Sequence, residues 1–408
     1  MKSYVKLLIS ITAALLVISG CEWDGPTAVY NQAQPDYPNA SISGIDPESA
    51  EAGVNYITIL GENFADSLTA NQVFFDNIQV DIIESTPTSL TVRRPKNSGD
   101  SLTINVVAYN SLIVATYESY QVDTVFSTYG NMVENKELEA LAVDDTGTLY
   151  VIQRDPKSIH KITPDGRRTV IGETVSIPTH AVIAPNGNLT YFKDKRIRQV
   201  DLITGVNDTL VELKKNAEFG DYDENGNLFT GGGRRSDLMI VRPDNSFEET
   251  DLYSSDKILY IRVVDNDGDN YVYILAEIDD PDENTPELGI FRHEIQDANG
   301  TLGEREVVFD WALTDSYVES TPAAFAFSQD GILFVGTDNL NPILMIDLEN
   351  GTQDIMYKDI LTGVIAEMAW GSGNHLYYLK DEYEDEEGNS DELFDLMRVD
   401  MGKPGVPY

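Results

Sequence analysis

Hydrophobic residues occur in short runs, partly alternating with polar residues, along most of the chain beyond residue 38. The alternation is clearest at 102–108, where Leu102, Ile104 and Val106 would lie on one face of an extended segment. Glycine, proline, asparagine and aspartate separate the runs, as they do at turns between β-strands. The pattern predicts an all-β protein.

Residues 38–122 form the first predicted domain. About seven short runs in roughly 85 residues are typical of an immunoglobulin-like β-sandwich. The segments 44–47, 57–64, 73–75 and 89–92 together resemble an IPT/TIG domain. The resemblance implies a spacer or an interaction module without catalytic residues, and a spacer is favoured.

Residues 123–408 contain six copies of one unit, in which an apolar strand, a polar turn closing on glycine and a second apolar strand follow one another. The closing glycines are spaced by 40, 39, 42, 63 and 42 residues, at Gly147, Gly187, Gly226, Gly268, Gly331 and Gly373. A period near 40 residues with four short strands in each unit is the signature of a propeller blade. The repeat predicts a six-bladed β-propeller.

The sixth unit reaches the end of the chain after its third strand, Leu396–Val399. The run 124–128 precedes the first unit and has no other partner, so we expect it to close the ring as the outer strand of blade six and to cover an open edge. The patterns at 178–187 and 322–331 resemble NHL-type six-bladed propellers, whereas the signatures of WD40 repeats are absent.

The N-terminal sequence predicts that the protein is exported from the cytoplasm. Residues 1–20 combine two lysines with an apolar stretch too short for a comfortable membrane span, as secretory signals do. Ile18-Ser19-Gly20-Cys21 resembles a bacterial lipobox, which implies cleavage before Cys21 and lipid attachment to it. The alternative is an ordinary secreted protein with a stray cysteine.

The segment 21–37 would then be a flexible tether that starts with acylated Cys21. Glu22 and Asp24 resemble the surface-export signal of lipoproteins from Bacteroidota, although a generic polar linker gives the same residues. We therefore expect an outer-membrane lipoprotein at the cell surface of a Gram-negative bacterium, with the membrane as partner through its lipid anchor.

Charge and composition exclude several classes of protein. The formal net charge of −41, from 69 acidic and 28 basic residues, repels a phosphate backbone, so no nucleic-acid partner is expected. A single cysteine excludes an internal disulfide and, with four histidines, disfavours a structural zinc site. A hydrophobic content of 41% argues against disorder.

The segment 265–269 is the best metal candidate. Asp265, Asp267 and Asp269 place carboxylates at alternate positions, where their oxygens could wrap a calcium ion. The spacing resembles calcium loops of other propellers, but Tyr273 stands where those loops usually carry another aspartate. The alternative, a solvated β-turn, fits the same position in blade four. Calcium is therefore the one candidate cofactor.

Trp311 and Tyr317 lie in the long fourth spacing and could offer aromatic faces to sugar rings; the alternative is packing within or between blades. Two acidic insertions, 279–287 and 381–391, should emerge on one face of the propeller, as functional or merely solvated loops.

No catalytic residues are assigned. His160 and His293 fall in the same register of opposite blades and cannot share a metal, while His180 starts an inner strand and could face the channel. Glu137 or Glu139 resembles the leading glutamate of gluconolactonase-type propellers, but no later ligands match.

We therefore expect a lipoprotein whose propeller binds a ligand without catalysis, with a glycan favoured by analogy to surface lipoproteins that act beside uptake machinery. One alternative is a protein-interaction scaffold within an envelope complex. A metal-dependent propeller lactonase or lyase is the other.

Overall fold

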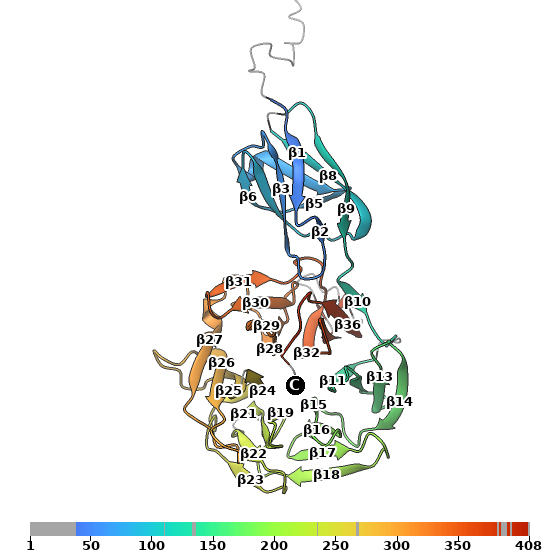
Figure 1. The fold of residues 1–408 in the computed structure, drawn as a ribbon. Coiled ribbons are helices and arrows are strands. Elements are labelled where there is room, and N and C mark those ends of the chain that lie inside the picture. The colour runs from blue at the N-terminus through green and yellow to red at the C-terminus, as the bar shows by residue number, and fades with distance from the viewer. Residues whose placement is uncertain are drawn as a thin grey trace, which may run out of the picture.

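The computed structural model describes residues 38–406, apart from 110, 133–135, 235, 267–268, 382, 385–389 and 392–393. Two β-domains stand end to end, a sandwich and a ring of blades (Figure 1). Within the described part, the only helical turns are the 3-10 helices η1 (Leu68–Ala70) and η2 (Trp311–Leu313), and no helix there is long and apolar enough to cross a membrane. The all-β prediction is confirmed.

The sandwich consists of two sheets, in the strand orders β1-β3-β7-β6 and β2-β9-β8-β4-β5. Alternate residues of its strands, such as Ile57 and Ile59, are buried between the sheets, as the alternating pattern requires. The strands are β1 (Ser41–Asp46), β2 (Ser49–Ala50), β3 (Tyr56–Glu62), β4 (Asn71–Phe75), β5 (Ile78–Val80), β6 (Ile82–Thr86), β7 (Ser89–Arg93), β8 (Gly99–Ala108) and β9 (Ala115–Val122).

The ring has six blades, and blades one to three precede the 63-residue interval between Gly268 and Gly331 in the sequence. Blade one contains β11 (Leu138–Val143), β12 (Leu149–Gln153), β13 (Ser158–Ile162) and β14 (Arg168–Glu173). Blade two contains β15 (His180–Ile183), β16 (Leu189–Lys193), β17 (Arg196–Val200) and β18 (Asn207–Glu212). Blade three contains β19 (Phe219–Tyr222), β20 (Leu228–Gly231), β22 (Met239–Val241) and β23 (Phe247–Glu249).

Blade four has a fifth, short strand at its inner edge, supplied by the connection within blade three. It contains β21 (Gly233–Arg234), β24 (Lys257–Asn266), β25 (Asp269–Glu277), β26 (Leu288–Glu294) and β27 (Glu306–Asp310). Blade five contains β28 (Pro322–Phe327), β29 (Ile332–Thr337), β30 (Ile343–Asp347) and β31 (Thr352–Ile355). Blade six contains β32 (Val364–Trp370), β33 (His375–Asp381) and β36 (Asp395–Asp400). A separate two-stranded sheet, formed by β34 (Tyr383–Glu384) and β35 (Ser390–Asp391), lies between β33 and β36 in the chain.

Burial within a blade explains its sequence pattern. All five residues of β12 are buried, because the inner strands are covered on both faces by neighbouring blades. No residue of the outer strand β14 is buried, and three of its six residues are polar. The turn glycines Gly147, Gly187 and Gly226 all have φ near +80°, a conformation that a residue with a Cβ adopts at a cost.

β10 (Phe126–Thr128) closes the ring. It pairs antiparallel with β36, with Phe126 opposite Val399 and Thr128 opposite Met397, and so forms the outer strand of blade six. The run 124–128 was predicted to form this outer strand, and the strand begins at Phe126. The Phe126 ring also stacks on Tyr378, with 6.3 Å between the ring centroids.

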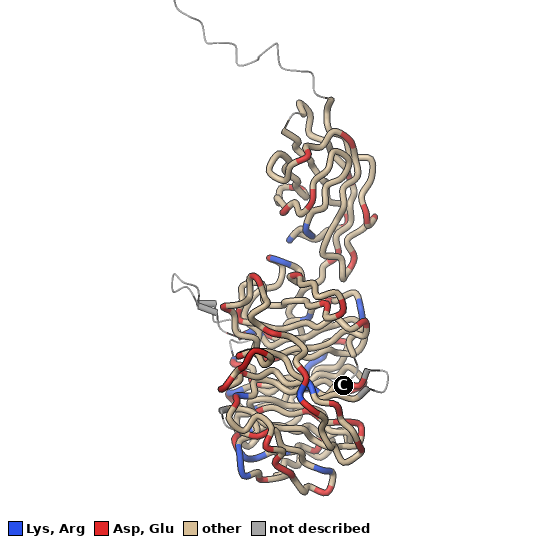
Figure 2. The backbone as a smooth tube through the Cα atoms, turned by 90° about the vertical axis from the view of Figure 1, so that its left-hand side faces the viewer, with Lys and Arg blue, Asp and Glu red and all other residues tan. Residues whose placement is uncertain are grey.

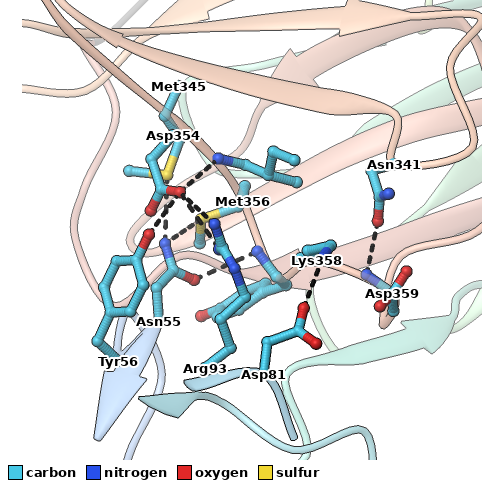
Figure 3. A network of polar contacts seen from close by, with 12 residues as sticks. Asn55, Tyr56, Asp81, Arg93, Asn341, Met345, Asp354, Met356, Lys358 and Asp359 are labelled. Atoms are coloured by element: carbon cyan, nitrogen blue, oxygen red, sulfur yellow. Dashed lines mark hydrogen bonds and ion pairs between the residues drawn. The ribbon is translucent and has the colours of Figure 1, made fainter. Parts of the chain in front are cut away.

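The sandwich contacts the rim of the propeller beside blades five and six (Figure 3). Tyr357 is central to this junction, because its backbone NH donates to Asn55 Oδ1 at 3.2 Å and its hydroxyl accepts from Gly53 NH at 2.6 Å. The same hydroxyl donates to the carbonyl of Asp400. Lys358 Nζ lies 2.6 Å from Asp81 Oδ2. The two domains are thus connected by specific contacts in addition to the linking chain.

Candidate functional site

A cavity of about 560 Å³ opens at one mouth of the propeller channel. The C-terminal ends of the inner strands β11, β15, β19 and β24 line it, together with Ala369 of β32. Small apolar side chains, among them Ala142, Ala181 and Val182, form part of its wall. A rigid ring of strands therefore holds a concave surface of the size typical of small-molecule sites.

A buried ion pair lies in the cavity wall between blades three and four. Arg262 Nη1 is 3.5 Å from Asp221 Oδ2, and both residues are buried. The same carboxylate oxygen accepts a 3.0 Å hydrogen bond from the backbone NH of Val263. Arg262 supplies the single positive charge among the residues that line the cavity.

Five further carboxylates line the cavity, and two of them accept hydrogen bonds within turns. Asp144 Oδ1 accepts from the backbone NH groups of Thr146 and Thr148, and Asp223 Oδ1 accepts from that of Asn227. Three others, Asp145, Glu224 and Asp265, are exposed at the rim. With Asp221 the cavity has six carboxylates, so it presents hydrogen-bond acceptors in a negative field.

Three side chains meet on the channel axis below the cavity. His180 Nδ1 lies 2.6 Å from Glu367 Oε2, and Tyr260 Oη donates to Glu367 Oε1 at 2.5 Å. These residues come from blades two, six and four, which are not neighbours in the ring, so their contacts cross the channel. His180 and Glu367 are buried and do not line the cavity. The channel is therefore filled at this level and the cavity ends there.

Sequence reasoning placed His180 near the channel but missed Glu367, Arg262 and Asp221. A usable signal existed, since Glu367 and Arg262 each interrupt an otherwise mostly apolar inner strand. A charged residue in such a strand predicts a paired, buried group. The pairing partner could not be read, because it lies on a different blade.

Trp311 and Tyr317 do not form an exposed sugar platform. The exposed fractions of Trp311 and Tyr317 are 2% and 1%, and both belong to the core cluster of blades four, five and six. Trp311 Nε1 donates to the carbonyl oxygens of Tyr317 and Ser320, and Tyr317 Oη donates to that of Asn341. The expectation of aromatic faces beside a groove is therefore wrong, because both rings pack inside the fold.

The calcium candidate is only partly described. Asp265 lies at the cavity mouth, at the end of the β24–β25 hairpin, where it is paired with Asn270. Asp267 lies outside the described residues, and for Asp269 only the backbone is described, in β25. No group of three or more possible metal ligands occurs among the described residues. Calcium binding by this segment stays a prediction.

The other candidates have structural partners. His160 Nε2 is 2.8 Å from Ser158 Oγ, and His293 Nε2 is 3.0 Å from Tyr253 Oη. Both Glu137 and Glu139 contact Arg154. The lipidation candidate Cys21 lies outside the described residues.

Comparison with known proteins identifies the class of each domain. Residues 40–122 match the family model of the IPT/TIG domain. The comparison with curated proteins found no match. The chain thus carries an IPT/TIG domain followed by a β-propeller, as its sequence predicted.

Three solved structures similar to this chain are propeller proteins. An auxiliary nutrient binding protein from Bacteroides thetaiotaomicron is 12% identical, with 90% of this chain and 98% of that chain covered and a TM-score of 0.51. The calcium-binding protein regucalcin from Agrobacterium tumefaciens is 16% identical, with 69% and 96% covered and a TM-score of 0.51. A luciferin-regenerating enzyme is 16% identical, with 69% and 98% covered and a TM-score of 0.53. At these identities the likeness shows the fold alone.

Proposed function

We propose that the protein is a lipid-anchored cell-envelope protein whose propeller binds a small ligand, in the first place a glycan, without changing it chemically. The observation that carries the binding function is the blind cavity of about 560 Å³ at the channel mouth. Sites for small molecules usually measure about 300–1,000 Å³ and combine apolar walls with a few polar groups. This cavity has both.

The lining favours a ligand rich in hydroxyl groups. Exposed carboxylates at the rim accept hydrogen bonds from hydroxyls, and the small apolar residues of the wall can pack against the C–H faces of a sugar ring. One protein of similar fold is a nutrient binding protein, which directs the choice of ligand toward a nutrient. The glycan would bind at the cavity, because Trp311 and Tyr317 are buried.

The envelope location is supported by the N-terminal sequence. The apolar segment that ends in Cys21, the only cysteine of the chain, supports lipid attachment there. Labelling cells with an alkyne palmitate analogue tests this step, and Cys21→Ser is the control that should lose the label. Protease treatment of intact cells tests surface exposure separately.

Ligand binding is tested by calorimetry on the mature chain against oligosaccharides released from extracted polysaccharides. The triple variant Asp145→Asn, Glu224→Gln and Asp265→Asn should weaken binding at least about tenfold, since it replaces three carboxylate acceptors of the rim by neutral amides, which accept weaker hydrogen bonds. The triple variant Asp208→Asn, Asp315→Asn and Glu319→Gln has the same change in charge on exposed residues outside the cavity and should bind as the parent does.

Each alternative has a distinct outcome. Turnover of a bound sugar or lactone, detected by mass spectrometry, would contradict binding without catalysis and favour the enzyme. An envelope protein recovered with the parent and with the rim variant alike, in the absence of sugar binding, would favour the scaffold.

A further inference from the structure

Five large apolar side chains are exposed at one end of the sandwich. They lie on η1 and on the connection between β8 and β9: Leu68, Tyr109, Leu112, Ile113 and Val114, with exposed fractions of 47%, 80%, 79%, 62% and 46%. The hydrogen bond from Tyr109 NH to the carbonyl of Ala70 holds the two segments together. We call these five residues the apolar tip. Contiguous exposed apolar side chains are uncommon on a soluble surface unless something binds them.

The chain enters the sandwich at this same end. Leu112 NH donates to Asn39 Oδ1 at 3.1 Å, and Ala40 NH donates to Ser111 Oγ at 3.1 Å. The propeller lies at the opposite end of the sandwich (Figure 1). The apolar tip therefore lies beside residues 39 and 40, where the chain that leads from Cys21 enters the sandwich.

The three segments that meet at the tip carry no charge. Residues 38–45, 67–75 and 101–117 contain no Asp, Glu, Lys or Arg, in a chain with a net charge of −41. The acidic residues of the described chain are spread over both domains, as the red segments of the backbone in Figure 2 show. An uncharged apolar end on so acidic a protein fits an apolar partner better than a polar one.

We propose that the apolar tip inserts into the lipid leaflet that holds the acyl chains of Cys21. This rests on lipid attachment at Cys21, which is part of the proposed function. Sixteen residues lie between Cys21 and Pro38, so the extended chain between them reaches at most about 60 Å, which keeps the tip close to the membrane surface. Exposed leucine, isoleucine and valine can enter the boundary of the acyl chains, and a tyrosine suits the interface with water.

Insertion would orient the protein. Acyl chains alone hold it at the surface but leave its angle free, whereas an inserted tip adds a second point of attachment. The junction between the sandwich and the propeller would then hold the propeller at the end away from the membrane.

The test uses the mature chain with Cys21→Ser, so that lipid attachment cannot contribute. Flotation with vesicles of equal parts phosphatidylcholine and phosphatidylethanolamine should recover this protein. Leu112→Asp combined with Ile113→Asp should reduce the recovered fraction at least about tenfold, because burial of two large aliphatic side chains is lost. The matched control is Ile203→Asp, which charges an apolar residue that is 96% exposed on the propeller and should leave recovery unchanged.

Three results would overturn the proposal. They are no recovery of the Cys21→Ser protein with vesicles, equal recovery of the tip variant and its parent, and a dimer in analytical ultracentrifugation that the tip variant abolishes, since a second copy would then cover the tip. None of them bears on whether Cys21 is acylated, which the palmitate label reports, or on ligand binding at the cavity.

Discussion

Tyr56 Oη donates a 2.7 Å hydrogen bond to Asp354 Oδ1, which joins the sandwich to the outer strand of blade five (Figure 3). Arg93 donates to the same oxygen from Nη1 and Nη2, at 3.3 and 3.2 Å, and its guanidinium carbon lies 5.1 Å from the centroid of the Tyr56 ring. Burial, followed by the bond to Asp354, raises the pKa of Tyr56 to about 12, so its hydroxyl stays a neutral donor at any physiological pH. The Asp354 carboxylate thus accepts three hydrogen bonds from the sandwich.

Asp354→Ala should therefore loosen the junction. Tyr56 and Arg93 would lose a charged acceptor, and hydrogen bonds to charged groups are worth about 1.5–3 kcal/mol each when buried, less here because the pair is partly exposed. We expect a loss of about 1–3 kcal/mol in the free energy of unfolding by urea. Asp208→Ala, on the exposed outer strand β18, should change it by less than about 0.5 kcal/mol. Equal midpoints for Asp354→Ala and the parent would contradict the role of Asp354.

The architecture could be predicted because its signals are local. Each turn glycine and each run of apolar residues acts within one blade, and the ring follows from repetition. Phe126–Thr128 could be placed because it was the strand left over once every other blade had its four.

Sites were harder to predict because they depend on neighbours from distant parts of the chain. A tryptophan in an insertion has the same sequence signature whether it packs or faces water, and Trp311 packs. Contacts across the channel, such as that between His180 and Glu367, join blades whose relative rotation no local pattern encodes.

Gly402→Ala should force the two domains apart. A Cβ at this position would lie 2.2 Å from the carbonyl oxygen of Ala52 in the sandwich, and the backbone φ is +67°. We expect a lower melting temperature and a changed interdomain arrangement in small-angle X-ray scattering, because backbone atoms must move.

Gly351→Ala is the matched control for that variant. Its φ is +65°, so it carries the same conformational cost of about 1–2 kcal/mol, but a Cβ there would meet no atom within 4 Å. It should lower the melting temperature without changing the scattering curve. If both variants behave alike, the close approach at Gly402 does not hold the domains.

Stability should fall as the solution becomes acidic, in part through His293. Burial lowers the pKa of His293 below its ordinary value, although the hydrogen bond with the carbonyl of Gly303 opposes this and Arg305 adds to it. The unfolded chain then binds a proton below about pH 6.5 that the folded chain does not, so the contribution is complete above that pH and is lost as the pH falls. Urea unfolding at pH 7.5 and 5.5 should show a larger loss for the parent than for His293→Gln. An equal loss would mean that His293 titrates alike in both states.

The cavity should discriminate ligands by charge. Six carboxylates and the single guanidinium of Arg262 line it, so its field opposes anions and favours cations. For sugars of similar size, we expect glucosamine to bind best, glucose less well, and glucuronate at least about fivefold more weakly than glucose, since one unit charge at 4 Å is worth about 1 kcal/mol even at the dielectric constant of water. Calorimetry at 20 and 500 mM salt should show the differences shrinking with salt, as screening requires.

The triple rim variant distinguishes the effect of the negative charge on binding from the effect of the shape of the cavity. Replacing Asp145, Glu224 and Asp265 by their amides keeps the size of each side chain and removes three negative charges, so the preference for glucosamine over glucuronate should narrow. The amides still accept hydrogen bonds, and glucose should therefore lose less affinity than glucosamine does. A preference for glucuronate in the parent would contradict the proposed role of the carboxylates, because a negative ligand could then bind only by a contact strong enough to overcome all six.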